Sequence, residues 1–292
     1  MFKGSLVALI TPFTAGGKLD EKGFQSFVAW QLEHGTHGLI PCGTTGESPT
    51  LSHDEHKRVV ELCIEVAKGK RPVIAGTGSN STDEAIELTR HAKKAGADAA
   101  LVVTPYYNKP TQEGLFLHYK AIHDAVEIPI IIYNIPGRCV IDMTPETMGR
   151  LAKLPNIVGV KDATNDLTRP FKTKRSCGDK FAQLSGEDAT ALAFLAQGGD
   201  GCISVTANVA PRQLADMHEA FVRGDIKKAQ TINDRLMPLH EALFVETSPA
   251  PVKFAASLLA KARPDCRLPL APLTDATREK VSAAMRGAGL TN

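Results

Sequence analysis

Residues 99–134 read AALVVTPYYNKPTQEGLFLHYKAIHDAVEIPIIIYN, and this segment gives the clearest indication of the fold class. Two short apolar runs, Ala99–Thr104 and Pro129–Asn134, enclose a longer amphipathic segment, Gln112–Val126. Short apolar runs of this length are typical of strands buried on both faces, and the longer segment is typical of a helix. A strand, a helix and a second strand in this order predict one βαβ unit with two parallel strands.

The same alternation extends over most of the chain. We expect eight strands, at Ser5–Ile10, Gly38–Cys42, Pro72–Gly76, Ala99–Thr104, Pro129–Asn134, Ile157–Lys161, Phe181–Ser185 and Gly201–Val205. Helical patterns lie between them, for example at Asp54–Lys68, Thr82–Ala95, Gln112–Val126 and Glu187–Gln197. Ser52, Ser81 and Thr144 are suitable N-cap residues for three helices. Eight such units predict an α/β fold, the (β/α)8 TIM barrel, for which about 200–250 residues suffice.

A doubly wound open sheet is the structural alternative. That fold usually carries a glycine-rich phosphate-binding turn after its first strand, whereas residues 9–13 read LITPF. The barrel is therefore favoured. After the last strand only helical patterns follow, at Pro211–Arg223, Ile226–Phe244, Pro251–Lys261 and Thr274–Ala288. We expect residues 1–223 to form the catalytic barrel and residues 224–292 to form a C-terminal helical domain.

The composition, with 43% hydrophobic and 23% charged residues, is that of an ordinary globular protein. A net charge of +2 without any basic block argues against nucleic acid as a partner. Neither a secretory signal nor an apolar run of membrane-spanning length is visible, so we expect a cytoplasmic protein with no membrane partner. The six cysteines are widely spaced, which indicates free thiols rather than a disulfide framework or a zinc site.

Lys161 ends the apolar run of the sixth expected strand. In a (β/α)8 barrel the active site lies at the carboxyl ends of the strands. Among apolar residues the charged form of a lysine amine is disfavoured, and the free amine attacks a carbonyl to form a Schiff base. The alternative is a solvated lysine that merely ends a strand, and the neighbouring strand ends decide between the two.

Tyrosine stands close to this lysine in the expected sheet. Period-two alternation places Ile131 and Tyr133 on one face of the fifth strand. It places Ile157, Gly159 and Lys161 on one face of the sixth. If both faces point inward, the Tyr133 hydroxyl and the Lys161 amine share one space, as a nucleophile with a proton shuttle.

Two further strand ends carry groups that suit an anion. Residues 43–46 read GTTG, which is not a Walker loop because no Gly-Lys-Ser/Thr follows. Its hydroxyl and N–H groups suit a small carboxylate, although a tight turn without function has the same pattern. Arg138, just past the fifth strand, suits a bidentate carboxylate clamp, and a plain surface role stays open for it.

Together these motifs closely resemble the dihydrodipicolinate synthase family. They read GTTGE at residues 43–47, TPYY at 104–107, YNIPGR at 133–138 and VKDAT at 160–164. The resemblance covers essentially the whole chain, and this set in this order is highly specific. It implies a pyruvate-dependent class I aldolase with a (β/α)8 barrel and a C-terminal helical part, assembled as a homotetramer.

The resemblance also implies the reaction. Lys161 would form an imine with pyruvate, and the resulting enamine would attack L-aspartate 4-semialdehyde. Tyr133, Thr44 and Tyr107 would relay protons, with Tyr107 supplied by a neighbouring subunit. The product would be (4S)-4-hydroxy-2,3,4,5-tetrahydrodipicolinate, on the route to diaminopimelate and lysine. No metal or other cofactor is implied, because the protonated imine is the electron sink.

Four residues resemble the family's substrate-binding positions. Thr45 resembles the residue that binds the pyruvate carboxylate, and Arg138 the residue that receives the semialdehyde. Gly186 and Ile203 match backbone positions that line the pyruvate pocket.

A second set of residues resembles the site at which some family members bind the end product L-lysine. The set comprises Ser48, Pro49, His53, His56, Asn80, Glu84 and Tyr106. Glu84 would pair with the ammonium group of lysine, and we expect feedback inhibition. His53 and His56 alone make a weak case for a metal site, because no third ligand accompanies them.

The chain departs from the family's common pattern at three positions. Asp162 and Asn165 stand where many members have Glu and Gly, and Pro49 stands where Ala is common. Within the superfamily, an N-acetylneuraminate lyase or a 2-keto-3-deoxy sugar acid aldolase shares the lysine, the tyrosine and the turn. Arg138 and the Tyr106–Tyr107 pair favour the synthase. A metal-dependent aldolase and a non-catalytic binding protein are further alternatives.

Overall fold

The computed structural model describes residues 2–292. Within this range the chain forms eight β-strands, and each begins and ends within two residues of its predicted limits. The strands are β1 (Gly4–Ala8), β2 (Gly38–Ile40), β3 (Ile74–Gly76), β4 (Ala99–Val103), β5 (Ile130–Asn134), β6 (Ile157–Asp162), β7 (Ala182–Ser185) and β8 (Gly201–Ser204).

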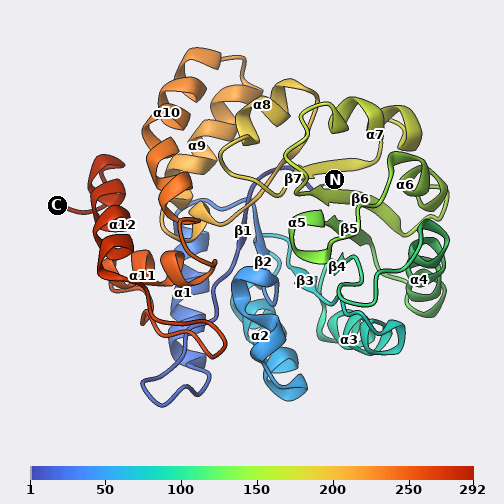
Figure 1. Cartoon of the computed structure of the whole chain (residues 1–292), viewed down its shortest axis with the longest axis horizontal. Helices are drawn as coiled ribbons and strands as arrows, with labels where there is room; N and C mark the ends of the chain where they lie inside the picture. The colour runs from blue at the N-terminus through green and yellow to red at the C-terminus, as the bar shows by residue number, and fades with distance from the viewer. Residues whose placement is uncertain (1) are drawn as a thin grey trace. The chain divides into compact units, whose positions relative to one another are not determined.

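Helices follow the strands in the predicted alternation (Figure 1). The α-helices are α1 (Glu21–Glu33), α2 (His53–Ala67), α3 (Thr82–Ala95), α4 (Gln112–Ala125), α5 (Pro136–Cys139), α6 (Pro145–Leu151), α7 (Arg169–Cys177), α8 (Ala191–Ala196), α9 (Pro211–Val222), α10 (Ile226–Ala242), α11 (Ala250–Leu258) and α12 (Asp275–Gly287). Three short 3₁₀ helices are η1 (Thr44–Gly46), η2 (Ser48–Thr50) and η3 (Thr206–Asn208). The chain has the (β/α)8 barrel fold with additional C-terminal helices, as predicted.

The chain divides into two compact units, and each is described by itself. The first comprises Phe2 and Lys3 with Pro72–Ile203. Its strands run in the order β3-β4-β5-β6-β7-β8, and all neighbouring pairs are parallel. The carboxyl ends of β4, β5, β6 and β7 therefore lie at one edge of this sheet.

Helix α4 illustrates how an outer helix is held on this sheet. Its buried residues Leu115, Tyr119 and Ile122 recur at intervals of four and three, and therefore lie on one face. The Tyr119 hydroxyl donates a 2.7 Å hydrogen bond to the Val102 carbonyl of β4. These side chains form one apolar core with Ile132 of β5. Full burial of each large apolar side chain contributes about 1.5–3 kcal/mol.

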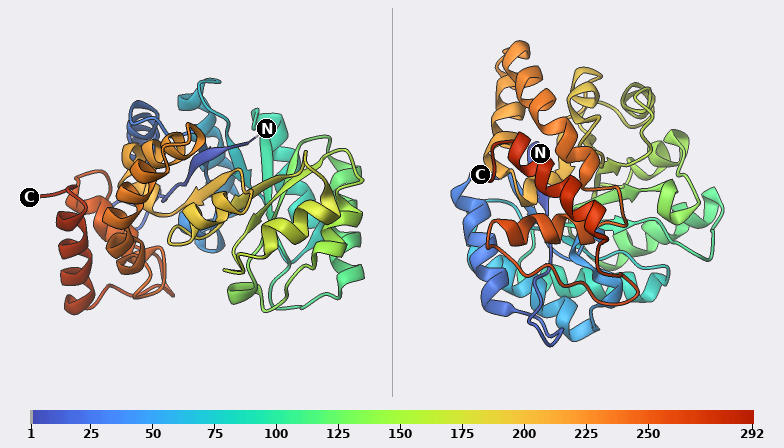
Figure 2. Two further views of the ribbon diagram at one scale, coloured as in Figure 1. Left: turned by 90° about the horizontal axis from the view of Figure 1, so that it is seen from above. Right: turned by 60° about the vertical axis from the view of Figure 1, so that its left-hand side comes forward.

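The second unit comprises Gly4–Arg71 and Ser204–Asn292. It holds the parallel pair β1 and β2 together with helices α1, α2 and α9 to α12. Helix α10 packs against α9 and α12, and α11 packs against α12 (Figure 2). Asn208 of η3 joins the C-terminal part to β1. Its Nδ2 donates to the Ala8 carbonyl at 2.7 Å, and its Oδ1 accepts from the Ile10 N–H at 3.0 Å.

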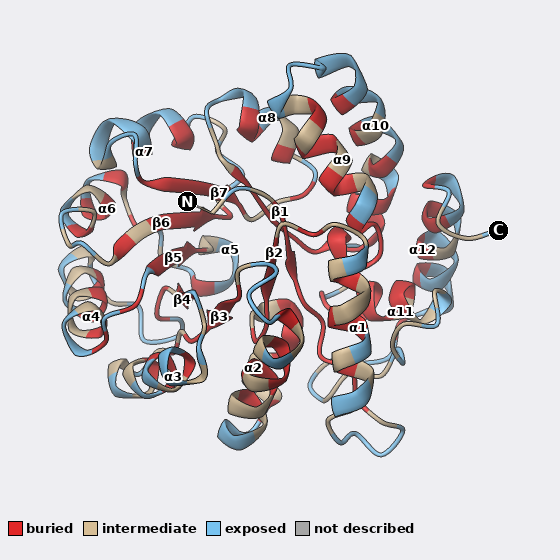
Figure 3. Ribbon diagram, turned by 180° about the vertical axis from the view of Figure 1, so that it is seen from behind, coloured by how far each residue is buried: buried red, intermediate tan, exposed pale blue. Residues whose placement is uncertain are grey.

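The predicted helix starts are confirmed where a capping residue marks them. At α2 the Ser52 hydroxyl accepts from the Glu55 N–H, and the Glu55 carboxylate accepts from the Ser52 N–H, which is a complete capping box. Ser81 caps α3 and Thr144 caps α6, each through its side-chain oxygen, which accepts from a backbone N–H of the first turn. Figure 3 shows that the buried residues of α2 are interspersed with half-buried residues, and exposed residues lie near its ends, as for an amphipathic helix packed on other elements.

One predicted helix begins later than expected. The segment predicted as Glu187–Gln197 becomes helical only at Ala191, where α8 starts. The Glu187 N–H donates to the Ser185 hydroxyl at 3.1 Å, so the chain makes a turn here before the helix. The domain boundary expected at residue 224 lies in the turn between α9 and α10, and it stays a prediction. Among residues 2–292, no helix combines the length and the apolar character needed to cross a membrane.

Candidate active site

Lys161 and Tyr133 lie side by side at the ends of β6 and β5, as predicted. The two residues are register partners in the parallel pair. The Lys161 Nζ lies 4.1 Å from the centroid of the Tyr133 ring. Both residues are nearly enclosed, with 6% and 5% of their surface exposed. The electron-rich ring face offsets part of the cost of burying an ammonium group. The arrangement is a sheltered amine nucleophile beside a phenol.

Strand β6 contains a bulge that period-two alternation did not predict. Ile157 and Gly159 face consecutive residues of β5, which leaves Val158 between them without a partner on that strand. One extra residue reverses the facing of the residues before it. Ile157 accordingly joins the apolar core with Val160. The prediction that Ile157 shares a face with Lys161 is therefore wrong, whereas Gly159 and Lys161 keep the predicted relation.

Gly186 and Ile203 belong to the same unit as Lys161. A Cβ added at Gly186 would lie 3.2 Å from the Lys161 Cε and 2.7 Å from the Ala163 Cβ. Glycine at this position therefore leaves room for the lysine side chain. Ile203 on β8 is fully buried.

Glu187 is a titratable group at the same edge that was not among the predicted site residues. Burial raises the pKa of its carboxyl above the usual 4.5, and the positive charges of Lys161 and Arg138 oppose that shift. Its carbonyl accepts a 3.0 Å hydrogen bond from the Ser185 hydroxyl, which fixes the local backbone. The sequence did contain the signal, because Glu187 directly follows the predicted lining residue Gly186.

Arg138 lies on α5, a single helical turn directly after β5. Its side chain is exposed. The turn is held against the end of β4, because the Cys139 thiol donates to the Thr104 carbonyl at 3.3 Å. An accessible guanidinium on a fixed turn suits bidentate binding of a carboxylate.

Tyr107 is not buried with Lys161 and Tyr133. It is 89% exposed and has a φ of +72°, which is uncommon for a bulky residue. A phenol this exposed is compatible with a role in a neighbouring subunit, which stays a prediction.

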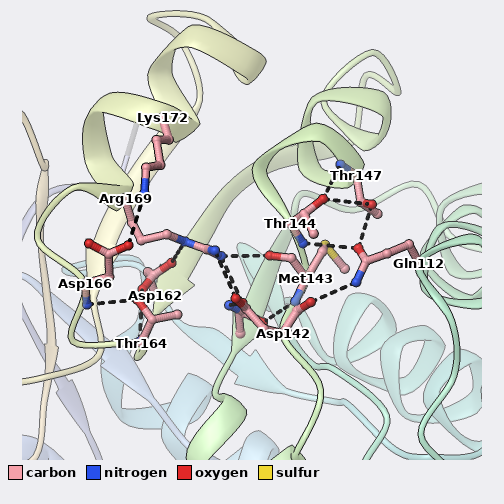
Figure 4. A network of polar contacts seen from close by, with 11 residues as sticks. Gln112, Asp142, Met143, Thr144, Thr147, Asp162, Thr164, Asp166, Arg169 and Lys172 are labelled. Atoms are coloured by element: carbon pink, nitrogen blue, oxygen red, sulfur yellow. Dashed lines mark hydrogen bonds and ion pairs between the residues drawn. The ribbon is translucent and has the colours of Figure 1, made fainter.

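Arg169, at the start of α7, is the centre of a cluster of charges (Figure 4). Two residues of the cluster directly follow the candidate catalytic pair, Lys161 and Tyr133, in the sequence. Arg169 is only 6% exposed. Its Nε donates to Asp162 at 3.3 Å, and its two terminal nitrogens donate to Asp142, each at 3.1 Å. A buried guanidinium is thus shared between two carboxylates.

The Arg169 cluster holds the residues that directly follow the candidate catalytic pair. Asp162 follows Lys161, and Asn134 follows Tyr133. Asn134 donates to Asp142 at 2.7 Å, so the same carboxylate contacts both Asn134 and Arg169. The ends of β5 and β6 are therefore tied to one another through polar side chains. No pattern in the sequence predicted this cluster.

The structure explains two departures from the family's common pattern. Asp162 Oδ1 accepts from both the N–H and the hydroxyl of Thr164, at 3.0 and 2.6 Å, which turns the chain after β6. Asn165 has a φ of +60°, a region that Gly adopts freely and Asn tolerates best among other residues. Asp162 and Asn165 therefore both fit the turn that follows Lys161 in this chain.

In the second unit, Thr44 and Thr45 form the tight turn η1 shortly after β2. Thr45 is 4% exposed. Left-handed residues bound the turn on both sides, Cys42 with φ +56° and Glu47 with φ +55°. A Cβ added at Gly46 would lie 3.1 Å from a backbone carbonyl oxygen just after β1, so a larger residue would fit only after a shift of a few tenths of an ångström. Binding of a carboxylate here stays a prediction.

The residues predicted to bind L-lysine fall in both units. In the first unit, Asn80 donates to the Tyr106 carbonyl at 3.2 Å. Burial and the nearby Glu84 carboxylate raise the pKa of Tyr106, which places these three residues together. The second unit holds half-buried Ser48, exposed Pro49 and His53, and buried His56. Among residues 2–292 no group of three His, Cys, Asp or Glu side chains could hold a metal ion.

All six cysteines, which lie within the described residues, are free, as predicted. Burial holds the pKa of the Cys42 and Cys202 thiols well above their usual range. Both thiols therefore stay protonated at neutral pH and pack as small apolar groups.

Comparison with known proteins agrees with this geometry. The chain matches the Dihydrodipicolinate synthetase family over residues 1–288. The 4-hydroxy-tetrahydrodipicolinate synthase of Rhodospirillum centenum is 69% identical over 290 residues, with 99% of each chain covered.

Two solved structures show the same fold. The chloride-inhibited dihydrodipicolinate synthase from Acinetobacter baumannii, complexed with pyruvate, gives a TM-score of 0.97 at 48% identity and covers 99% of this chain and 100% of that one. The enzyme from Cyanidioschyzon merolae with lysine bound gives 0.96 at 41% identity, with 99% of each chain covered. The chain is therefore a Schiff-base-forming lyase and belongs to the dihydrodipicolinate synthetase family.

Proposed function

We propose that this chain condenses pyruvate with L-aspartate 4-semialdehyde, as a 4-hydroxy-tetrahydrodipicolinate synthase. The observation that carries the proposal is the buried Lys161 amine 4.1 Å from the Tyr133 ring. The similarity to an enzyme of this name from Rhodospirillum centenum supports it. The pyruvate in the Acinetobacter baumannii structure supports the choice of the first substrate.

The proposed chemistry begins at the Lys161 amine. The amine adds to C2 of pyruvate and water leaves, which gives a protonated imine. Loss of a proton from C3 gives an enamine, whose C3 attacks the aldehyde carbon and forms the new C–C bond. The aldehyde oxygen takes up a proton. The amino group of the semialdehyde then attacks C2, and the Lys161 amine leaves as the ring closes.

We assign the remaining roles from the family resemblance. Tyr133, Thr44 and a neighbouring subunit's Tyr107 transfer protons, as general acid–base groups. Thr45 binds the pyruvate carboxylate, and Arg138 binds the carboxylate of the semialdehyde.

Gly186 and Ile203 line the pyruvate pocket, and both lie in the unit that contains Lys161. The reaction needs no metal or other cofactor, because the protonated imine accepts the electron pair released at C3. The working assembly is a cytoplasmic homotetramer.

L-Lysine is the proposed feedback inhibitor, because the Cyanidioschyzon merolae enzyme holds lysine. The grouping of Asn80, Glu84 and Tyr106 provides a carboxylate for its ammonium group, and an amide and a phenol for its other polar groups. Pro49 is expected to stiffen one edge of the effector site, and inhibition then differs in strength from relatives that have Ala.

Trapping of the imine tests the proposal. Incubation with pyruvate, reduction with borohydride and peptide mass mapping should give one adduct, on Lys161. The Lys161→Ala variant should give no adduct and should lose more than about 10³-fold in rate. Lys153→Ala, which removes an exposed lysine, is the matched control and should behave as the wild type.

Adding the semialdehyde or a sugar acid to the same assay separates the synthase from related aldolases. L-Lysine should lower the rate with the semialdehyde. An adduct on another lysine, or activity retained by Lys161→Ala and abolished by a chelator, would contradict the mechanism.

A further inference from the structure

The residue that follows the Thr44–Thr45 turn η1, Glu47, belongs to a buried ion pair. Glu47, the residue after the turn, accepts a 2.6 Å hydrogen bond from the Lys253 Nζ of α11. The side chains of Lys253 and Glu47 are 0% and 1% exposed. The second carboxylate oxygen of Glu47 accepts from the Arg267 N–H at 2.9 Å. Both oxygens of this carboxylate are thus held by the C-terminal part of the second unit.

The backbone of Glu47 is part of the turn that it follows. Its N–H donates to the Thr44 carbonyl at 3.1 Å, and its own carbonyl accepts from the Thr50 N–H at 2.9 Å. The φ of +55° is unfavourable for a residue with a Cβ. A residue keeps such a conformation only where surrounding contacts fix it, and residues of this kind are frequent at ligand-binding sites. The contacts of the Glu47 carboxylate with Lys253 and Arg267 fix its backbone in this conformation.

Arg267 strengthens the same contact from the loop between α11 and α12. Its guanidinium donates to the Glu55 carboxylate at 2.6 and 2.7 Å and to the Thr50 carbonyl at 2.8 Å. Lys253 and Arg267 also lie against the Phe13 ring, 4.2 and 4.3 Å from its centroid. The residues on both sides of η2 are therefore bound to the C-terminal part of the unit.

Folding stability alone does not account for a pair of this kind. Replacing a buried ion pair with apolar residues of similar size is often neutral or stabilising, because the two charges lose much hydration when buried. A carboxylate held at both oxygens does, however, hold its own backbone in one conformation. That conformation ends the turn containing Thr45.

We propose that Lys253, acting through Glu47, is a positioning residue for the pyruvate-carboxylate turn, with Arg267 as a second support. The C-terminal helices would then be part of substrate binding, although none of their residues need touch the substrate. The inference rests on the proposed function, in which Thr45 binds the pyruvate carboxylate. A small displacement of a substrate-binding group is sufficient to lower catalysis greatly.

The pyruvate dependence of Lys253→Met tests the inference. We expect its KM for pyruvate to rise about 10- to 100-fold, whereas the KM for the semialdehyde changes little. Borohydride trapping should show the same shift in the pyruvate concentration needed for the Lys161 adduct. Arg263→Gln is the matched control, because it breaks an exposed ion pair with Asp265 in the same loop, and it should leave both KM values unchanged.

A second variant separates positioning from stability. Glu47→Gln combined with Lys253→Met removes both charges at once, so no unpaired charge stays buried. Its stability should return towards the wild-type value, while its KM for pyruvate should stay raised by at least about tenfold. A folded single or double variant with the wild-type KM would overturn the inference. A double variant that fails to fold would also overturn it, since the pair would then serve folding itself.

Borohydride trapping with the wild type separates a failure of the proposed function from a failure of the positioning role of Lys253. If the wild type forms no pyruvate adduct on Lys161, the proposed function fails. If the wild type forms the adduct and Lys253→Met forms it at the same pyruvate concentration, only the positioning role fails.

Discussion

Two charge clusters adjoin the residues of the proposed site, and they are built differently. The Arg169 cluster joins residues of neighbouring segments: Arg169 and Asp142 are 27 positions apart, and the Asp142 side chain is 46% exposed. The Glu47 cluster comprises Glu47, Lys253, Arg267 and Glu55. Glu47 bonds to residues 206 and 220 positions away, and the side chains of the Lys253–Glu47 pair are 0% and 1% exposed. One cluster forms within consecutive β/α units, and the other requires the C-terminal helices to be in place.

This difference in hydration decides what each cluster contributes. Where one partner still contacts water, losing the other leaves a charge that can rehydrate, and the cost is small. Where both partners are buried, losing one leaves an unpaired charge in an apolar environment. The Arg169 cluster also contains a buried pair, since the Arg169 and Asp162 side chains are 7% and 4% exposed. Without Arg169, however, Asp162 keeps the N–H and hydroxyl of Thr164 as donors, whereas without Lys253 the Glu47 carboxylate keeps the Arg267 N–H. The two clusters should therefore respond unequally to the removal of their cations.

The largest loss of stability is expected for Lys253→Met. The change leaves the Glu47 carboxylate 1% exposed and without its ammonium partner. Removing one partner of a buried pair costs about 3–5 kcal/mol in the free energy of unfolding. Urea unfolding of the wild type and the variant measures the loss, with Arg263→Gln as the exposed control. A loss below that of Arg169→Met would break the comparison between the two clusters.

Arg169→Met should have a smaller effect on stability and a different effect on catalysis. Asp142 can rehydrate, whereas Asp162, 4% exposed in its side chain, loses one of its partners. We expect a loss of about 1–3 kcal/mol. Because the cluster holds the ends of β5 and β6, kcat should fall about tenfold while the KM for pyruvate changes little.

Lys172→Met is the control for Arg169→Met. It removes an exposed cation of the same helix, whose Nζ lies 3.4 Å from the exposed Asp166 carboxylate. Unfolding in urea and steady-state kinetics should both match the wild type. A rise in the KM for pyruvate in Arg169→Met, with kcat unchanged, would contradict the assignment of this cluster to the catalytic pair.

Regular patterns along the chain explain which features the sequence could predict. The eight strands were found because parallel strands are buried on both faces and read as short apolar runs. The pairing of Tyr133 with Lys161 followed from their places at neighbouring strand ends. These features follow from periodic patterns within single strands and from the order of the strands. The Arg169 cluster is equally local, but it follows no such pattern.

The missed features depend on tertiary contacts. The bulge at Val158 is defined only by the pairing of β6 with β5, and no residue type marks it beyond the adjacent Gly159. Lys253 lies on a helix, where a lysine is usually solvated, yet it is fully buried by a partner 206 residues away. No local period or spacing distinguishes it from the exposed lysines.

The smallest effect is expected for the Glu55–Arg267 pair, which lies at the solvent-exposed edge of the Glu47 cluster. Its contribution can be measured as a dependence of stability on pH. Arg267 is the main cause that lowers the pKa of Glu55 from 4.5 to about 2. A carboxylate whose pKa is lower in the folded protein stabilises that state above its unfolded pKa. The stabilisation is complete above about pH 4.5 and is lost as the pH falls towards 2.

Glu55→Gln removes this contribution and should make unfolding less sensitive to pH between 4.5 and 2. A pair this close to the solvent contributes at most about 1 kcal/mol, so at neutral pH the variant should unfold nearly as the wild type does. Thermal unfolding at a series of pH values measures the difference. If Glu55→Gln instead lost as much stability at pH 7 as Lys253→Met, the Glu55–Arg267 pair would behave as a buried pair. The Glu47 cluster would then contain two buried pairs, in contrast to the hydrated Asp142–Arg169 pair.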